Sequence, residues 1–464
     1  MNGEFAALRS PYSQRVTAAL LLAGPVVLSL IVGAAIVWNP ILAALPIAML
    51  ASALLLADGR LRTLFIVIGA LAIFQSSEEL SPLKAGYLLG VGVCFLGAIH
   101  RVAVLRTSDA YRVALPLVRI SLAFVALIFV SLPVATATGI PKIDWLRDAA
   151  PYVFFALAPL FALDAQSSMT KRALERLLVL AGIVAAVSLA VTWIERREIA
   201  ELPIARFAFP SLLLAAALFA YATAHALEGP ARRGRWIALA ALVLTLAVVT
   251  GSRVNLLLLV APLAIAVGAR RHLARRTVRL AVAGPILVGI MLIAFQSAVN
   301  LTGGRESVLV ERQALLFSIG DERIDQSYTD RTIQAEAAWD VFAAHPFLGV
   351  GLGYRFEWTD AAGAVQSSFN PDTFVTFLAN FGSLGIIAIA IFVIGYISFL
   401  RSLARNRPAR IPYLTLIGHT AVIGAVAFQA PPFEEKGLAL ALLLLLALAL
   451  REVSQPSVRS NHGV

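Results

Sequence analysis

Charged residues are scarce in this chain. Only 14% of its 464 residues are Asp, Glu, Lys or Arg, whereas 59% are hydrophobic. An ordinary soluble domain carries about 25% charged residues, and a chain of this size with so few could not cover a water-facing surface. The composition therefore excludes a soluble fold and predicts a polytopic membrane protein.

Cysteine and metal-binding patterns are also nearly missing. The single cysteine, Cys94, lies inside an apolar run, which excludes a disulfide framework and a cysteine-based metal site. No His, Asp or Glu spacing of the HExxH or DxD kind occurs. The sequence therefore predicts neither a metal ion nor a cofactor.

Long apolar runs fill most of the chain instead. About fourteen of them approach the length of about 20 residues that a membrane-spanning helix needs, and several short ones leave a count of twelve or thirteen open. The runs lie at 17–38, 41–57, 62–75, 85–99, 113–132, 149–163, 174–193, 207–226, 236–250, 254–269, 279–298, 373–400, 411–429 and 437–450. The predicted fold class is an all-α polytopic membrane protein with about 12–14 transmembrane helices, of which the first is retained and not cleaved as a signal peptide.

Basic residues gather in every second loop between these runs, for example in RSPYSQR, DGRLR, MTKRALER and ARRHLARRTVR. The positive-inside rule places those loops and both termini in the cytoplasm. The net charge of +11 is thereby assigned to membrane orientation and not to nucleic-acid binding. The predicted parts are a membrane bundle of about eleven helices at 1–298, a large outer loop at 299–372, membrane helices at 373–450 and a cytoplasmic tail at 451–464.

Arginine is nonetheless frequent in the outer loops, where the rule predicts few. Its planar guanidinium suits phosphate and never deprotonates, so these arginines either hold a diphosphate or are solvated and pair with nearby Glu and Asp. Arg253 is the sharpest case, because its tight TGSRVN turn has no acidic neighbour and a charge at the bilayer edge is costly. The candidate substrate-binding residues are Arg206, Arg253, Arg305, Arg312, Arg331 and Arg355.

Within 299–372 the pattern predicts one helix, at about 330–345. Thr329 or Asp330 would cap it, and Pro346 would end it. Arg331 would then lie at the positive N-terminal end, which favours an anion. The following GVGLG lacks the preceding strand of a nucleotide-binding fingerprint, so its glycines are predicted to serve a tight turn or a close backbone approach.

Two residues of this segment are candidates for a general base. His345 is the only histidine in an outer loop and has a suitable ordinary pKa, although it would also serve as a cation at a helix C-terminus. Asp372 is predicted at the start of the next membrane helix. There it either caps that helix or, held ionised, accepts a proton from a sugar hydroxyl.

Four stretches resemble the O-antigen ligase and O-antigen polymerase superfamily of bacterial envelope glycosyltransferases. IARFAFPSLLLAAALF is similar to a family segment with an arginine, here Arg206, and TGSRVNLLLL to a serine-arginine turn, here Arg253. In PDTFVTFLANFGSLG, Pro371 and Asp372 stand where many members have His-Asn. The most recognisable stretch is DRTIQAEAAWDVFAAHPFLGVGLGYRF, whose family positions map to Arg331, Trp339, Pro346, Gly349, Gly351 and Gly353.

The resemblance implies a glycosyltransferase-C-like membrane fold and a metal-independent polymerase at the periplasmic face of the inner membrane. The polymerase would transfer glycan repeat units from undecaprenyl diphosphate onto a glycan acceptor. Arg206, Arg253 and Arg331 would hold the diphosphate, and Asp372 or His345 would take the acceptor proton. The implied partners are the undecaprenyl-diphosphate-linked oligosaccharide and the lipid bilayer, and chain-length regulator and flippase proteins are further candidates.

Three alternatives stay open. A ligase would transfer one preformed glycan to a lipid or protein acceptor, but the absent family histidine counts against this reading. A transporter or flippase of lipid-linked sugar would need charged or broken helices near the membrane midplane, whereas these apolar runs are almost free of charge. An inactive relative is the remaining alternative, because it would tolerate the loss of the histidine.

Overall fold

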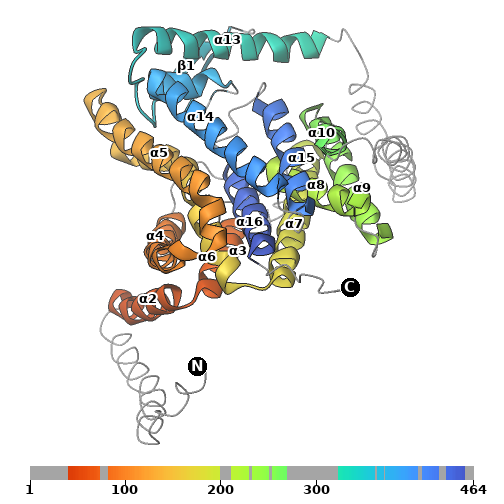
Figure 1. Ribbon diagram of the computed structural model, residues 1–464. Helices are drawn as coiled ribbons and strands as arrows, with labels where there is room; N and C mark the ends of the chain where they lie inside the picture. Colours follow the sequence, from red (N-terminus) through yellow and green to blue (C-terminus); the bar gives the residue numbers. More distant parts are fainter. Residues whose placement is uncertain are drawn as a thin grey trace, which may run out of the picture.

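The protein is a helical bundle that a polar helix crosses at one end. The computed structural model describes residues 40–73, 82–198, 211–228, 233–249, 253–268, 322–360, 363–369, 371, 373–405, 410–427 and 435–454. Figure 1 shows α13 (Glu322–Ala344) lying across the end of the bundle that is uppermost in the view. This end is called the α13 end below.

The bundle helices coincide with the apolar runs of the sequence. Among the described residues, six helices are long and apolar enough to cross a membrane. They are α4 (Pro82–Val104), α5 (Asp109–Ala137), α6 (Lys142–Ser168), α7 (Lys171–Glu198), α14 (Val375–Ala404) and α15 (Arg410–Ala427). The prediction of an all-α polytopic membrane protein is confirmed, while the runs at 17–38 and 279–298 lie outside the described residues.

The bundle contains further helices among the described residues. They are α2 (Pro40–Ala57), α3 (Gly59–Ile73), α8 (Leu212–Glu228), α9 (Arg233–Val249), α10 (Val260–Gly268) and α16 (Lys436–Val453). Two 3-10 segments, η1 (Leu105–Thr107) and η2 (Arg253–Leu259), follow α4 and precede α10.

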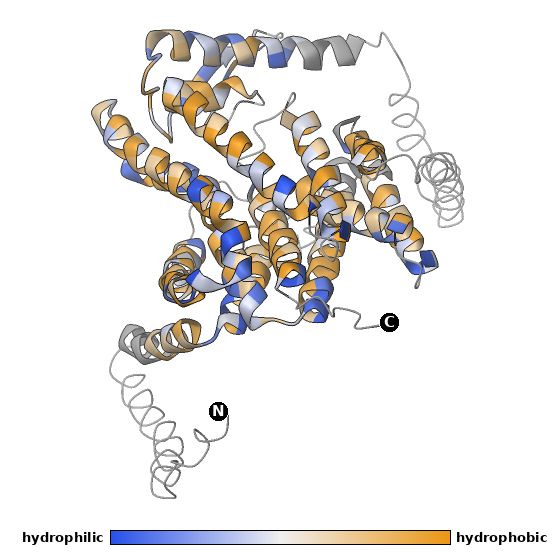
Figure 2. Cartoon of the chain, in the orientation of Figure 1, coloured by the Kyte–Doolittle hydropathy of each residue, from blue (hydrophilic) through white to orange (hydrophobic). Residues whose placement is uncertain are grey.

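The centre of the bundle is formed by α6, α8 and α16. Every residue from Leu438 to Leu450 of α16 is buried, and α16 packs along α6. A helix that is apolar on all sides belongs in such a core. The outer helices α5 and α14 instead expose large apolar side chains, such as Phe129 and Ile394, which suits a lipid-facing surface. Figure 2 shows hydrophobic residues along the bundle helices and a larger hydrophilic share on α13.

Two hydrogen bonds set the relative depth of α6 and α16. Near the end opposite α13, Gln166 of α6 accepts from the Arg451 guanidinium at 3.0 Å and from the Ser454 hydroxyl at 3.2 Å. Asp148 and Glu435 lie eighteen and nineteen residues before Gln166 and Ser454 in their chains. Because an α-helix rises about 1.5 Å per residue, Asp148 and Glu435 lie at about the same depth, near the α13 end.

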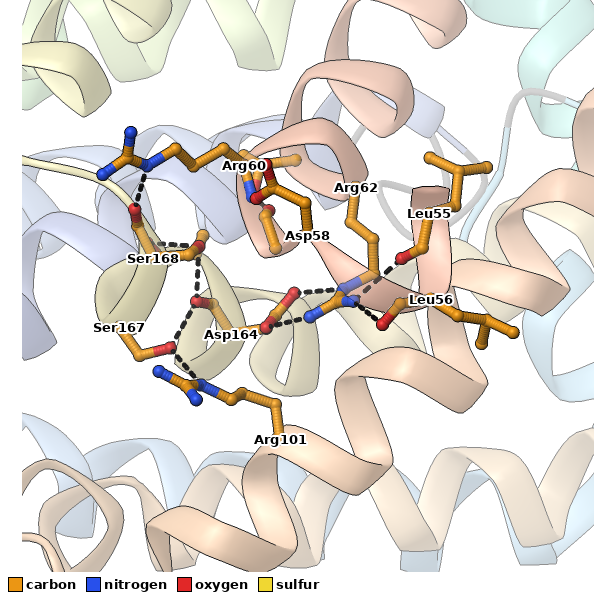
Figure 3. A network of polar contacts seen from close by, with 12 residues as sticks. Leu55, Leu56, Asp58, Arg60, Arg62, Arg101, Asp164, Ser167 and Ser168 are labelled. Atoms are coloured by element: carbon orange, nitrogen blue, oxygen red, sulfur yellow. Dashed lines mark hydrogen bonds and ion pairs between the residues drawn. The ribbon is translucent and has the colours of Figure 1, made fainter. Parts of the chain in front are cut away.

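A buried ion pair holds α3 to α6 at the opposite end of the bundle (Figure 3). The Arg62 guanidinium donates two hydrogen bonds to the Asp164 carboxylate, both at 2.7 Å. It also donates to the carbonyls of Leu55 and Leu56 at 2.8 Å, so the turn between α2 and α3 is tied to the same group. The two charged side chains are 4% and 2% exposed, which makes this a fully desolvated pair.

A short hairpin joins α13 to the bundle. Strands β1 (Phe356–Thr359) and β2 (Val365–Ser368) pair antiparallel. Phe356 is buried against Ala338 of α13 and Ala379 of α14, so the hairpin, α13 and the start of α14 share one small apolar cluster. The sequence analysis did not predict these strands.

The helix predicted at 330–345 exists, but its start was predicted wrongly. It begins at Glu322, because the polar segment before Thr329 consists largely of residues that a helix tolerates. Neither Thr329 nor Asp330 caps the helix, and Arg331 lies in its middle and not at its positive N-terminal end. The helix ends at Ala344, two residues before Pro346, as predicted.

Candidate functional site

The backbone of α14 is interrupted at Gly382, about two turns after the helix begins. Gly382 has φ 61° and ψ −152°, a region that essentially only glycine occupies. The segment 346–351 fills this interruption and pairs with the backbone groups that the break leaves free. The bonds run from Val350 N–H to the Ala379 carbonyl (2.9 Å), from Gly351 N–H to the Asn380 carbonyl (3.0 Å) and from Ser383 N–H to the Pro346 carbonyl (2.8 Å).

The three glycines of the GVGLG stretch allow the chain to pack closely against the backbones of neighbouring helices. Gly349, Gly351 and Gly353 all have positive φ, between 68° and 86°. A Cβ at these positions would lie 2.5–2.6 Å from backbone atoms of α14, α5 and α6 in turn. The prediction that these glycines serve turns and close backbone approach is confirmed.

Asp148 receives the end of this glycine segment. Its Oδ2 accepts a hydrogen bond from the Gly353 N–H at 2.9 Å, and the residue is only 3% exposed. A buried carboxylate is costly unless it is hydrogen-bonded, so this bond helps to hold Gly353 beside the first turns of α6. Arg355 follows two residues later and is thereby brought close to the start of α6.

Two arginines converge on one aromatic ring at this point. The Arg147 guanidinium carbon lies 3.3 Å from the centroid of the Phe369 ring, and that of Arg355 lies 4.5 Å from it. Within the part of the chain that the structure describes, neither arginine forms an ion pair. We call this group the arginine clamp (Arg147, Phe369 and Arg355). Two guanidinium groups that share a ring without a carboxylate form a site suited to an oxyanion.

A second polar group lies at the same depth on neighbouring helices. Oε1 of Glu435, just before α16, accepts hydrogen bonds from the Ser211 hydroxyl and from the Leu213 N–H at the start of α8. The Leu213 carbonyl in turn accepts from the buried His419 ring of α15 at 3.0 Å. Burial raises the pKa of Glu435 from 4.5 to about 7, which is the range in which a carboxylate can exchange protons near neutral pH.

Several predicted site residues lie outside the described residues. These are Arg206, Arg305, Arg312 and Asp372. The backbone of Arg253 begins η2, next to α9 and α10. The roles predicted for these five residues remain predictions.

The structure does not bring Arg331 and His345 together. They lie fourteen residues apart on and just after α13, which corresponds to about 21 Å along a helix. His345 is exposed, and Trp339 is 53% exposed with its ring 5.3 Å from that of Phe342. Of the predicted arginines whose side chains are described, Arg355 is the one in the clamp.

Arg147, Asp148, Ser211 and Glu435 were not predicted as site residues. A signal existed for the first two, because the charged pair Arg147–Asp148 directly precedes the predicted membrane run at 149–163. No local signal connects Ser211 with Glu435, which are 224 residues apart. Among the described residues, no group of three or more His, Cys, Asp or Glu side chains is placed to hold a metal ion.

No curated protein sequence matches the chain significantly. Residues 238–393 match the protein family described as O-Antigen ligase. That interval contains α13, the hairpin and the break in α14, together with Arg355 and Phe369 of the clamp. The match covers about a third of the chain, so this part of it is similar to the O-antigen ligase family, and six described helices are long and apolar enough to cross a membrane.

Proposed function

We propose that the chain is a polysaccharide polymerase of the bacterial inner membrane. It would transfer glycan repeat units from undecaprenyl diphosphate onto a glycan acceptor at the α13 end, with both termini in the cytoplasm. The observation that carries the proposal is the arginine clamp. It presents two guanidinium groups that have no carboxylate partner among the described residues, where the glycine segment, α6 and α14 meet.

The orientation follows from the placement of charge. Arg60, Arg62 and Arg101 lie around the end of α6 opposite α13, and they come from loops that the positive-inside rule assigns to the cytoplasm. The α13 end would then face the periplasm. Chain-length regulator and flippase proteins are candidate partners at the α13 end and within the membrane.

The clamp would act on the leaving group. When the bond between the anomeric carbon and the diphosphate oxygen breaks, negative charge accumulates on the diphosphate. Preorganised donors that meet this charge stabilise the transition state more than the ground state. Phe369 holds the two guanidinium groups in place before substrate binds, which reduces the entropy lost on binding. Arg206, Arg253 and Arg331 are proposed as further contacts to the same anion.

Replacement of Arg147 by alanine tests the clamp. We expect the initial rate of glycan transfer to fall about 10²–10³-fold, as for other lost donors to a developing anion. The rate would be measured with purified protein in lipid nanodiscs and lipid-linked oligosaccharide extracted from cells that lack this chain. Arg112→Ala is the matched control, because Arg112 is exposed and pairs only loosely with Asp109 at 3.8 Å, so its rate should stay within about twofold. A normal rate for Arg147→Ala would exclude the clamp from substrate binding.

Arg253→Ala tests the proposed function in cells. We expect the variant to insert into the membrane and yet to make no long-chain polysaccharide, because the diphosphate would lose a contact at the membrane rim. The chain-length distribution on a gel provides the measurement. A normal distribution in the variant would contradict the role assigned to Arg253.

The products of the nanodisc reaction distinguish the candidate functions. A ladder of lengthening lipid-linked chains indicates a polymerase, and a single transfer to a lipid or protein acceptor indicates a ligase. A transporter would form neither product. The break in α14 does not favour transport, because it lies near one end of the helix and its backbone groups are paired with 346–351, whereas transporter sites lie near the midplane.

A further inference from the structure

Among the described residues, Glu435 has no cation as a partner. Both of its side-chain hydrogen bonds fall on Oε1. In the described part of the chain, Oε2 accepts none and no Lys or Arg pairs with it. Glu435 is partly buried, and a carboxylate that loses part of its hydration is expected to gain a cation or further donors in return. One oxygen of Glu435 therefore remains available for another group.

The position of Glu435 suits a role beside the arginine clamp. It lies at about the depth of Asp148, and Arg147 of the clamp is the residue before Asp148. The helices α6 and α16 pack directly against each other, and packed helices have axes about 8–10 Å apart. Glu435 and Arg147 thus belong to two directly packed helices, at about the same depth and at the same end of the bundle. A sugar whose diphosphate is held at the clamp would lie at the depth of Glu435.

We propose that Glu435 is the catalytic general base, which accepts the proton of the attacking acceptor hydroxyl, and that Ser211 is the residue that positions it. The proposal rests on the proposed glycan transfer. It places this role on Glu435 and not on the two candidates from the sequence. Of these, Asp372 is part of the Pro371–Asp372 pair that stands where many relatives carry His-Asn, and His345 is the outer-loop histidine.

Oε2 of the Glu435 carboxylate takes the proton from the acceptor hydroxyl while the hydroxyl oxygen forms a bond to the anomeric carbon of the donor. The bond between that carbon and the diphosphate oxygen breaks, and its electron pair leaves with the lipid diphosphate, whose charge the clamp stabilises. The protonated Glu435 then releases its proton to water or to the departing diphosphate.

The surroundings of Glu435 support a proton acceptor that works near neutral pH. The described groups that face it are the Ser211 hydroxyl and the Leu213 N–H of α8, with His419 of α15 on the far side of the same peptide and Asp148 of α6 at the same depth. Burial raises the pKa of Glu435 to about 7, while the two hydrogen bonds act in the opposite direction. Below that pH the group is protonated and cannot act as a base. The transfer rate should therefore fall about tenfold per pH unit on the acid side.

Glu435→Gln is the first test. Glutamine keeps an oxygen that can accept from Ser211 and Leu213, so a purely structural role predicts a nearly unchanged rate. A general base predicts a kcat reduced about 10²–10⁴-fold with donor binding unchanged. Glu228→Gln is the matched control, because Glu228 lies at the opposite end of α8 and pairs with Arg410; its rate should stay within about twofold.

Ser211→Ala is the second test. It shows whether Glu435 acts as the general base even if the Glu435→Gln variant fails to insert into the membrane. Removing the hydroxyl removes a bond that favours the ionised form of Glu435, so the acid limb of the pH–rate profile should move to higher pH. A merely structural Ser211 would lower the rate without moving the limb.

The outcomes separate the two proposals. A wild-type protein that transfers no glycan to any acceptor overturns both the proposed function and the role of Glu435. An active wild type overturns only the role of Glu435 if Glu435→Gln keeps its rate, if the limb stays in place in Ser211→Ala, or if the large loss appears instead in Asp372→Asn or His345→Gln.

Discussion

Replacing Gly382 by alanine is expected to destabilise the protein by about 2–6 kcal/mol and to abolish glycan transfer. An L-residue at φ 61° and ψ −152° costs about 1–3 kcal/mol. The added Cβ would also lie 2.5 Å from the carbonyl carbon and oxygen of Phe347, and overpacking of this kind costs another 1–3 kcal/mol. Relief of the clash requires the segment 346–351 to leave the break in α14. The clamp would then lose its support, because the same segment leads to Arg355.

The measurement is the midpoint of unfolding in detergent, followed by the transfer rate of the protein that remains folded. Gly92→Ala is the control, because Gly92 lies within α4 and a Cβ there would meet no atom within 4 Å. That variant should be neutral or more stable by about 0.5–1 kcal/mol, since alanine loses less backbone entropy in a helix. If Gly382→Ala unfolds at the same midpoint as the wild type, the backbone hydrogen bonds between 346–351 and α14 do not determine the stability of the α13 end.

The second large effect is expected from Asp164→Ala at the opposite end. The variant leaves the Arg62 guanidinium buried, with two carbonyl acceptors, no ion-pair partner and only the more distant Asp58 as a counter-charge. Removing one partner of a buried ion pair typically costs about 3–5 kcal/mol, because the remaining charge is uncompensated. The loss should lower the unfolding midpoint while the protein that stays folded keeps its transfer rate, since this pair lies far from the clamp.

The exposed pair of Arg112 and Asp109 provides the comparison. Its side chains are 73% and 81% exposed, so Asp109→Ala should change stability by about 0–1 kcal/mol. Similar losses in the two variants would show that the Arg62–Asp164 pair is more hydrated than its burial indicates. A double variant, Arg62→Leu with Asp164→Leu, should recover much of the loss, because it removes both buried charges.

Much of the fold was predictable because membrane helices depend on local properties. An apolar run of sufficient length must form a helix in lipid, since that satisfies its backbone within the segment. The runs at 113–132 and 149–163 accordingly lie inside α5 and α6. The hairpin was not predicted, because each strand has only four residues and its apolar contacts come from α13 and α14.

The candidate site was predictable only in part. The glycines after α13 could be assigned to close backbone approach, because glycine in that pattern has few other uses. Arg331 was placed at the end of its helix, although α13 starts at Glu322, because helix boundaries depend on weak local signals. Arg147 and Glu435 were missed, since neither belongs to a motif and both acquire their surroundings from other helices.

The sequence by itself indicated a multi-pass membrane protein, the positions of its apolar helices, and the family that residues 238–393 match. These properties follow from local hydrophobicity and from short motifs that are readable without knowledge of the fold. Only the tertiary structure decided which charges meet. Arg147 and Arg355 are brought to Phe369, and Ser211 to Glu435, by helix packing and by the glycine segment inserted into α14. The physical reason is that contacts between residues about 200 positions apart depend on the relative depth of packed helices, which no local pattern encodes.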